Sequence, residues 1–148
     1  MDSRISIRPA APEDIAALAD LSTQLGYPAE AETIGVRLAQ VREQRAGQVF
    51  VAVNGASVVI GWTHVAPRLN IEEEPFAELA GLVVGDRARG RGVGALLLHA
   101  AEDWAREQGY ARLRVRSNVL RERAHGFYRR EGYVERKRQV VFEKPLRD

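Results

Sequence analysis

The feature that most constrains this 148-residue chain is a glycine-rich turn between a strand-like and a helix-like segment. Residues 77–84 form the expected strand, and residues 92–108 carry apolar side chains at the spacing of an amphipathic helix. The turn holds three alternate glycines and three nearby arginines: Gly90, Gly92, Gly94, Arg87, Arg89 and Arg91. Glycines let the backbone approach an anion closely, and the first N–H groups of a helix lack partners and lie at its positive end. This order predicts a site for a phosphate or pyrophosphate.

Two known phosphate-binding patterns, the dinucleotide-binding fingerprint and the P-loop, match this turn only in part. Residues 90–95 match the dinucleotide pattern G-x-G-x-x-G/A, but that site needs an acidic residue about 20 positions further on, at the end of the next strand. That strand ends Arg-Val-Arg-Ser-Asn at residues 114–118, without a carboxylate. A P-loop requires a lysine at the start of the helix, and this turn has none. A turn that only connects strand and helix would not require so many glycines and arginines.

The remaining patterns predict an α/β fold, a mixed sheet with helices on both faces, in the order β-αα-βββ-α-β-α-ββ. A hairpin with a turn at Asn54-Gly55 is the clearest element. The expected strands are 5–8, 49–53, 58–65, 77–84, 113–115, 133–134 and 139–142, and the expected helices are 12–25, 29–45, 92–108 and 122–130.

Length and composition narrow the class of protein. The length fits one domain, residues 1–148, and the absence of cysteine excludes a disulfide framework and Cys-ligated zinc. No apolar run reaches the roughly 20 residues of a membrane span, and no signal-peptide pattern opens the chain, so we expect a cytoplasmic protein. Residues 1–100 carry 9 Lys/Arg against 12 Asp/Glu (net −3), and residues 101–148 carry 13 against 8 (net +5). We interpret the basic part as a solvated surface, since the chain lacks the interleaved aromatic residues and reader motifs of a nucleic-acid-binding protein.

Two spaced motifs together resemble the GNAT superfamily of N-acetyltransferases. The acetyl-CoA signature of that family, Arg/Gln-x-x-Gly-x-Gly/Ala, stands here as Arg89-Gly90-Arg91-Gly92-Val93-Gly94. A second sequence block of that family is matched here by Asn118, Ala124, Phe127-Tyr128 and Gly132-Tyr133. The order of helices and strands also resembles that of the family over essentially the whole chain. The stretch 123–133 resembles the small-molecule branch of the family, which includes aminoglycoside acetyltransferases. The resemblance implies a mostly antiparallel sheet, acetyl-CoA as cosubstrate, no metal and a possible homodimer.

The resemblance also implies where acetyl-CoA binds. Backbone N–H groups of residues 89–94 would hold its phosphates. The pantetheine arm would lie along the fourth strand like an added strand, against Leu82, Val83 and Val84. Asn118 would hydrogen-bond this arm, although capping of a helix is an alternative role for it. Tyr128 would stand near the sulfur and protonate the leaving thiolate, unless its hydroxyl is merely structural.

The proton acceptor and the acceptor-binding residues are less constrained. Glu78 lies in the fourth strand, where many family members carry a carboxylate that takes the amine proton. Strand alternation puts Glu78 on one face with Ala80, Leu82 and Val84, where a desolvated carboxylate suits a base; an exposed glutamate is the alternative. Glu72, Glu73 and Glu74 would either attract a cationic amine or form a solvated loop. Tyr27 would close over the acceptor or anchor the first two helices, and His64 and His125 lack a metal-ligand spacing.

The sequence thus predicts an acetyl-CoA-dependent N-acetyltransferase that acts by direct transfer on a small, cationic primary amine. Acetylation of protein N-termini or lysines is an alternative within the same class. A non-catalytic acyl-CoA-binding module is an alternative from another class, and the presence of both Glu78 and Tyr128 argues against it.

Overall fold

The computed structural model describes residues 4–117 and 120–147. The chain forms two compact units, residues 1–116 and residues 117–148, and each is described by itself. The first unit contains a sheet and three α-helices, and the second contains one helix and the C-terminal segment.

The sheet of the first unit has five strands in the order β1-β2-β3-β4-β5. Strands β1 to β4 are antiparallel neighbours, and β5 lies parallel to β4. The strands span Ser6–Pro9 (β1), Gln48–Val53 (β2), Val59–Arg68 (β3), Phe76–Val84 (β4) and Leu113–Val115 (β5). The mixed, mostly antiparallel sheet expected from the sequence is confirmed.

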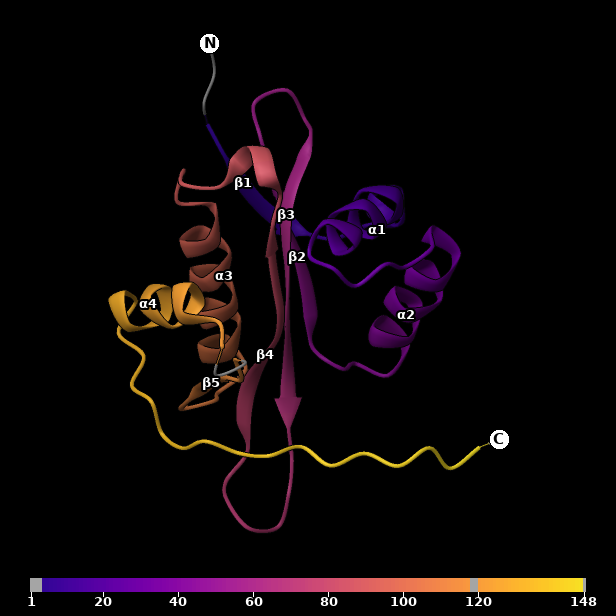
Figure 1. Ribbon diagram of the computed structural model, residues 1–148. Coiled ribbons are helices and arrows are strands. Elements are labelled where there is room, and N and C mark those ends of the chain that lie inside the picture. The colour runs from indigo at the N-terminus through magenta and orange to yellow at the C-terminus, as the bar shows by residue number, and fades with distance from the viewer. Residues whose placement is uncertain (1–3, 118–119, 148) are drawn as a thin grey trace. The chain divides into compact units, whose positions relative to one another are not determined.

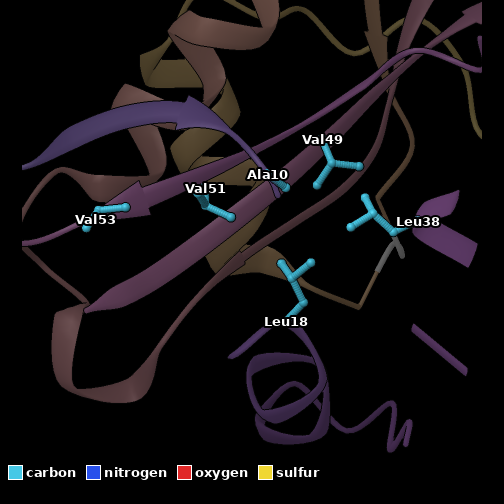
Figure 2. Packing of buried hydrophobic residues seen from close by; sticks show 6 residues of the cluster. All are labelled: Ala10, Leu18, Leu38, Val49, Val51 and Val53. Atoms are coloured by element: carbon cyan, nitrogen blue, oxygen red, sulfur yellow. The ribbon is translucent and has the colours of Figure 1, made fainter. Parts of the chain in front are cut away.

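The three α-helices of this unit cover both faces of the sheet (Figure 1). Helices α1 (Ile15–Gln24) and α2 (Ala31–Glu43) lie on one face, and α3 (Val93–Glu107) lies on the other. Leu18 of α1 and Leu38 of α2 pack toward Val49 and Val51 of β2 (Figure 2). On the opposite face, Leu97 of α3 is fully buried. The sheet is therefore held between two apolar layers.

An ion pair fixes the entry into α1. Asp14 is buried, and Arg8 of β1 donates two hydrogen bonds to its carboxylate, at 2.7 and 3.0 Å. The Arg8 guanidinium lowers the pKa of the Asp14 carboxyl below its ordinary value, and the Ala11 N–H adds to this effect against the opposing cost of burial. The edge strand and the first helix are thereby joined by charge as well as by apolar contact.

A β-bulge interrupts β4 at Ala80. His64 pairs with Gly81 and Val65 pairs with Leu79, so one residue of β4 has no opposite partner in β3. The fully buried Thr63 donates a 2.6 Å hydrogen bond from its hydroxyl to the Gly81 carbonyl beside the bulge. Because of this extra residue, the β4 side chains before the bulge emerge on the opposite face from the one that strict alternation with Leu82 and Val84 would give. This change of face determines the surroundings of Glu78.

Two sequence predictions differ from the structure. The hairpin between β2 and β3 is confirmed, but its turn runs from Asn54 to Val58, because the Asn54 carboxamide accepts hydrogen bonds from the N–H groups of Ala56 and Val58.

In the second unit, α4 (Glu122–Arg130) is present as expected. The two closing strands expected at 133–134 and 139–142 are not: residues 133–147 form no helix or strand in the described structure.

Gly47 provides a test of how closely the connection between α2 and β2 packs against β3. Its φ is +96°, and a Cβ there would lie 1.9 Å from the Val65 carbonyl oxygen, whereas Gly109 has φ +88° with open space around it. We expect Gly47→Ala to lower the free energy of unfolding by about 3 kcal/mol or more, because it adds a backbone clash to the strain of a positive φ. Gly109→Ala has only the strain and should cost about 1 kcal/mol. Urea unfolding of both variants measures the difference, and equal losses would contradict the packing described.

Candidate active site

The glycine turn has the geometry of an anion site. Helix α3 begins after Gly92, which has φ +76° and makes no side-chain cap, and Gly90 has φ +81°. A Cβ at either glycine would meet nothing within 4 Å, so these positions require glycine for backbone conformation. The first intrahelical acceptor is the Gly92 carbonyl, which the Leu96 N–H reaches at 3.2 Å. The N–H groups of residues 93–95 therefore lack intrahelical acceptors and are available to an anion.

Arginines surround this turn. Arg89 lies 3.1 Å from the Asp86 carboxylate, and both side chains are exposed. Arg87 and Arg91 are also exposed, and neither forms an ion pair within the described residues. The net positive charge adds attraction for a phosphorylated ligand to the backbone donors of α3.

A side-chain hydrogen bond ties the turn to α1. The Asp86 N–H donates to the Gln24 carboxamide oxygen at 3.1 Å, and Gln24 in turn donates to Asp20 at 3.0 Å. Gly85, the preceding residue, packs closely against Leu21 of α1, since a Cβ at this glycine would be 3.1 Å from Leu21 Cδ2. The end of α1 thus supports the segment that enters the glycine turn, a role that no sequence motif marks.

Strand β4 is paired with β5 along only part of its length. Strand β5 pairs with it only over Ala77–Leu79, so the residues from Ala80 to Val84 have no strand partner on that side within the first unit. Because the Gly85 N–H donates to the Ile60 carbonyl, alternation turns the peptide groups of Val83 toward β3 and those of Leu82 and Val84 toward the unpaired edge. This edge leads directly into the glycine turn.

The surroundings of Glu78 differ from the sequence prediction. The bulge at Ala80 puts Leu82 and Val84 on the face of α3, whereas Glu78 pairs with Ala66 on the opposite face. Its side chain is 13% exposed and lies between two arginines. Its carboxylate is 2.6 Å from Arg116 Nε and 3.7 Å from Arg68 Nε. Glu78 is thus a half-buried, ion-paired carboxylate and not a lone acid on an apolar face.

The acidic loop before β4 is partly neutralised. Arg114 of β5 donates two hydrogen bonds to the Glu73 carboxylate, at 3.1 and 2.9 Å, and its guanidinium stacks 3.8 Å over the Phe76 ring. Arg112 lies 3.8 Å from Glu73 and 3.9 Å from Glu74. Glu72 is exposed and forms no ion pair within the described residues. From the sequence these arginines were expected to form a solvated basic surface, whereas their alternation at 112, 114 and 116 places them on one face of an extended segment, where they meet the glutamates.

Tyr128 belongs to the second unit. Its ring lies 5.1 Å from that of Phe127 and 6.0 Å from that of Tyr133, both in edge-to-face contact. Burial raises the pKa of the Tyr128 hydroxyl above its ordinary value, and the nearby charge of Arg121 opposes this with a smaller effect. The hydroxyl is therefore protonated at neutral pH, as a proton donor must be.

The other predicted residues are less informative. Tyr27 is 68% exposed in the connection between α1 and α2, and Asn118 lies outside the described residues. His64 of β3 forms a 2.9 Å hydrogen bond with the Ala46 carbonyl, a structural contact. Within residues 4–117 and 120–147, no cluster of His, Asp or Glu could hold a metal ion, and no helix has the length and apolarity needed to span a bilayer.

The chain is similar in sequence to proteins of one family. The family model of the acetyltransferase (GNAT) family matches residues 13–133. The aminoglycoside N(6')-acetyltransferase type 1 of Stenotrophomonas maltophilia is 34% identical over 145 residues, which cover 95% of this chain and 94% of that protein. The aminoalkylphosphonate N-acetyltransferase of Salmonella typhimurium is 43% identical over 58 residues, which cover 39% of this chain and 38% of that protein.

Solved structures show the same fold. Aminoglycoside N-acetyltransferase AAC(6')-Iy in complex with CoA superimposes with a TM-score of 0.87 at 19% identity, covering 97% of both chains. AAC(6')-Ih from Acinetobacter baumannii superimposes with a TM-score of 0.83 at 18% identity, covering 97% of this chain and 99% of that one.

The chain therefore belongs to the acetyltransferase (GNAT) family. It is an acetyl-CoA-dependent N-acetyltransferase, and acetyl-CoA is its cosubstrate.

The Arg114–Glu73 contact generates a test of how the site is held together. We expect Arg114→Lys to lower the free energy of unfolding by about 1 kcal/mol, because lysine cannot form the bidentate hydrogen bond or the flat stack on Phe76. Arg106→Lys is the control, since Arg106 and its partner Asp103 are about 70% exposed and such pairs contribute little. Chemical denaturation compares the two variants, and an unchanged stability of Arg114→Lys would show that the contact is not stabilising.

Proposed function

We propose that the protein transfers the acetyl group of acetyl-CoA directly to a primary amine of a small acceptor in a ternary complex. The observation that carries this proposal is the unpaired edge of β4, which continues into the glycine turn.

Both units are proposed to form one catalytic domain, since the family model spans the boundary between them. The exposed apolar side chains of the C-terminal segment support a further proposal, that the protein dimerises: Val140, Val141 and Phe142.

The turn and the edge fit the two parts of the cosubstrate. The N–H groups of residues 93–95, together with the backbone and arginines of residues 89–92, would bind the pyrophosphate. The pantetheine arm would then run from the turn along β4, hydrogen-bonded to Leu82 and Val84 as an added strand. From Val84 back to Ala80 the strand spans about 13 Å at ~3.3 Å per residue, which carries the arm toward the bulge.

The bulge would then mark the reacting end. Transfer requires attack of the neutral amine nitrogen on the thioester carbonyl carbon, loss of a proton from the amine, and departure of the thiolate. A backbone N–H near the bulge would polarise the carbonyl oxygen. Tyr128 is proposed to give its proton to the departing sulfur, and its protonated state at neutral pH supports this role.

Glu78 is proposed to take the amine proton. Its position two residues before the bulge and its partial burial support this role. Arg116 Nε lies 2.6 Å from the buried oxygen Oε1, whereas Arg68 Nε is 3.7 Å from Oε2 and the Arg68 side chain is 50% exposed. The second oxygen is therefore the one that an amine, or a water between them, would reach by displacing the loosely held Arg68.

The acceptor is proposed to be an aminoglycoside-like polyamine. The relative that covers nearly the whole chain is an aminoglycoside N(6')-acetyltransferase, which supports this class. Attraction of a cation would rest mainly on Glu72, because Glu73 is neutralised by Arg114 and Arg112 and Glu74 lies 3.9 Å from Arg112. Release of CoA thiol with aminoglycosides, aminoalkylphosphonates and peptides as acceptors tests the class, and thiol release with peptides alone would contradict it.

The cofactor site is tested by a charge placed in the turn. We expect Gly92→Asp to weaken acetyl-CoA binding by about 100-fold or more, because the carboxylate repels the pyrophosphate at the start of α3. Gly109→Asp is a matched control: it has a similar φ of +88° and open space, but lies beyond the other end of the helix. Titration calorimetry on both folded variants measures the affinities. Parent-like affinity in Gly92→Asp would place the cosubstrate elsewhere.

The two proton-transfer roles are tested together. We expect Glu78→Gln to lower kcat and remove the acidic limb of the pH–rate profile, since glutamine cannot accept the proton. Tyr128→Phe should lower kcat about 100-fold without changing acetyl-CoA affinity, because only the donor is lost. Tyr110→Phe removes a hydroxyl from a ring stacked on Trp104 and serves as the control. An unaltered pH profile in Glu78→Gln, or a kcat within about threefold of the parent in Tyr128→Phe, would refute the corresponding role.

A further inference from the structure

A second candidate binding site lies at the end of the sheet away from the glycine turn. A cavity of about 420 Å³ opens there, within the size range of small-molecule sites. Its walls come from four elements, the end of β1, the C-terminal end of α2, the start of β2 and the C-terminal end of α3. Its principal lining residues are Ala10, Leu38, Arg42, Arg45, Gln48 and Trp104.

The cavity exists because the edge strand is short. Strand β1 ends at Pro9, and the last bond to β2 in this region is donated by the Ala10 N–H to the Val49 carbonyl at 2.8 Å. Helices α2 and α3 lie on opposite faces of the sheet and both extend toward this end (Figure 1). Their C-terminal ends therefore lie near the start of β2, at the point where β1 no longer pairs with it. Ala10, Leu38 and Val49 form an apolar floor, and their side chains lie close together in Figure 2.

The charge of the cavity is positive. Arg42 donates a 2.7 Å hydrogen bond from Nη2 to the Ala10 carbonyl, which fixes its guanidinium and leaves its other N–H groups for a ligand. Arg45 is exposed and forms no hydrogen bond or ion pair through its side chain within the described residues. No carboxylate is among the lining residues. Two guanidinium groups thus share one concave site without a neutralising partner there.

The backbone of Arg45 is unfavourable for arginine. Arg45 has φ +50° just after α2, where the Ala46 N–H returns to the Val41 carbonyl at 2.9 Å. This left-handed position after a helix is usually occupied by glycine, because a Cβ is strained there. An arginine at such a position, with its side chain lining a cavity, indicates a role other than stability.

The remaining walls suit a flat ligand. The Trp104 indole lines the cavity and is held by stacking on Tyr110, with ring centroids 6.0 Å apart. Leu38 and Val41 supply aliphatic surface, and Gln48 and Gln108 add polar groups at the margin. The combination of one indole, an aliphatic floor and two guanidinium groups matches an organic molecule with an apolar body and an acidic group.

We propose that this cavity binds a small organic anion, a carboxylate with a flat apolar body. Its acidic group pairs with Arg42 and Arg45, and its apolar body packs on Trp104 and Leu38. The site is separate from the acetyl-CoA site, since Trp104 follows Gly92 by 12 residues, about 18 Å along α3. It does not depend on the proposed catalytic roles.

Benzoate is the probe, and the two indole N–H signals in a nitrogen–proton correlation spectrum are the readout. The chain has two tryptophans, so Trp104→Phe identifies the Trp104 signal. We expect benzoate to shift the Trp104 signal in a saturable manner and to leave the Trp62 signal in place. Benzyl alcohol, which has the same ring without the charge, should shift it at least about fivefold less at equal concentration.

Arginine variants separate binding from stability. Arg45→Gly should weaken benzoate binding at least about fivefold while raising the melting temperature, because glycine relieves the positive φ. Arg42→Gln should weaken binding as well. Arg37→Gln is the matched control on an exposed part of α2 outside the cavity and should bind benzoate like the parent. An unmoved Trp104 signal, or parent-like benzoate affinity in the folded Arg45→Gly variant, would overturn the proposal.

Discussion

The partial pairing of β4 with β5 is the constraint on which the proposed site depends. The parallel pair covers Ala77–Leu79 and then ends, while β4 continues to Val84. A strand with one side bonded and the other side unpaired is a template for another extended chain. Here the unpaired part leads into a helix whose first N–H groups lack acceptors, so one continuous stretch of backbone presents donors for an extended arm and for a phosphate group.

The bulge at Ala80 connects this backbone to side-chain chemistry. It separates the part of β4 that pairs with β5 from the part that does not, and it changes the face on which side chains emerge. Val84 meets the α3 layer, whereas Glu78 emerges on the opposite face beside Arg68 and Arg116. Removal of Thr63, which bonds to Gly81 beside the bulge, would therefore disturb both the proposed cofactor edge and the proposed base.

The sequence predicted most of the fold because its elements have strong local signals. The helix after Gly92 and the short strand at 113–115 are marked by apolar periodicity and by bounding glycine and polar residues, and both are present. The glycine turn was predicted from residue type, and the positive φ of Gly90 and Gly92 accounts for it. These features depend on a few neighbouring residues, which is why a single sequence contains them.

The surroundings of the charged residues could not be predicted, because they depend on register between distant strands. Gly81 within β4 is only a weak signal of a bulge and does not give its register, so strict alternation assigned Glu78 to the wrong face. The pairing of Arg114 with Glu73 joins residues 41 positions apart, and local pattern does not reveal it. The closing strands were expected at two short apolar stretches, 133–134 and 139–142, but a strand also needs a partner edge, and residues 133–147 pair with none in the described structure.

Amide hydrogen exchange along β4 tests the central claim most directly. Residue-resolved exchange would be followed in the free protein and with saturating acetyl-CoA. If the pantetheine arm adds to the edge, the Leu82 and Val84 amides slow by about 10-fold or more on binding, whereas the Val83 amide, already bonded to β3, is slow in both states. Unchanged exchange at Leu82 and Val84 in the saturated complex would contradict the account.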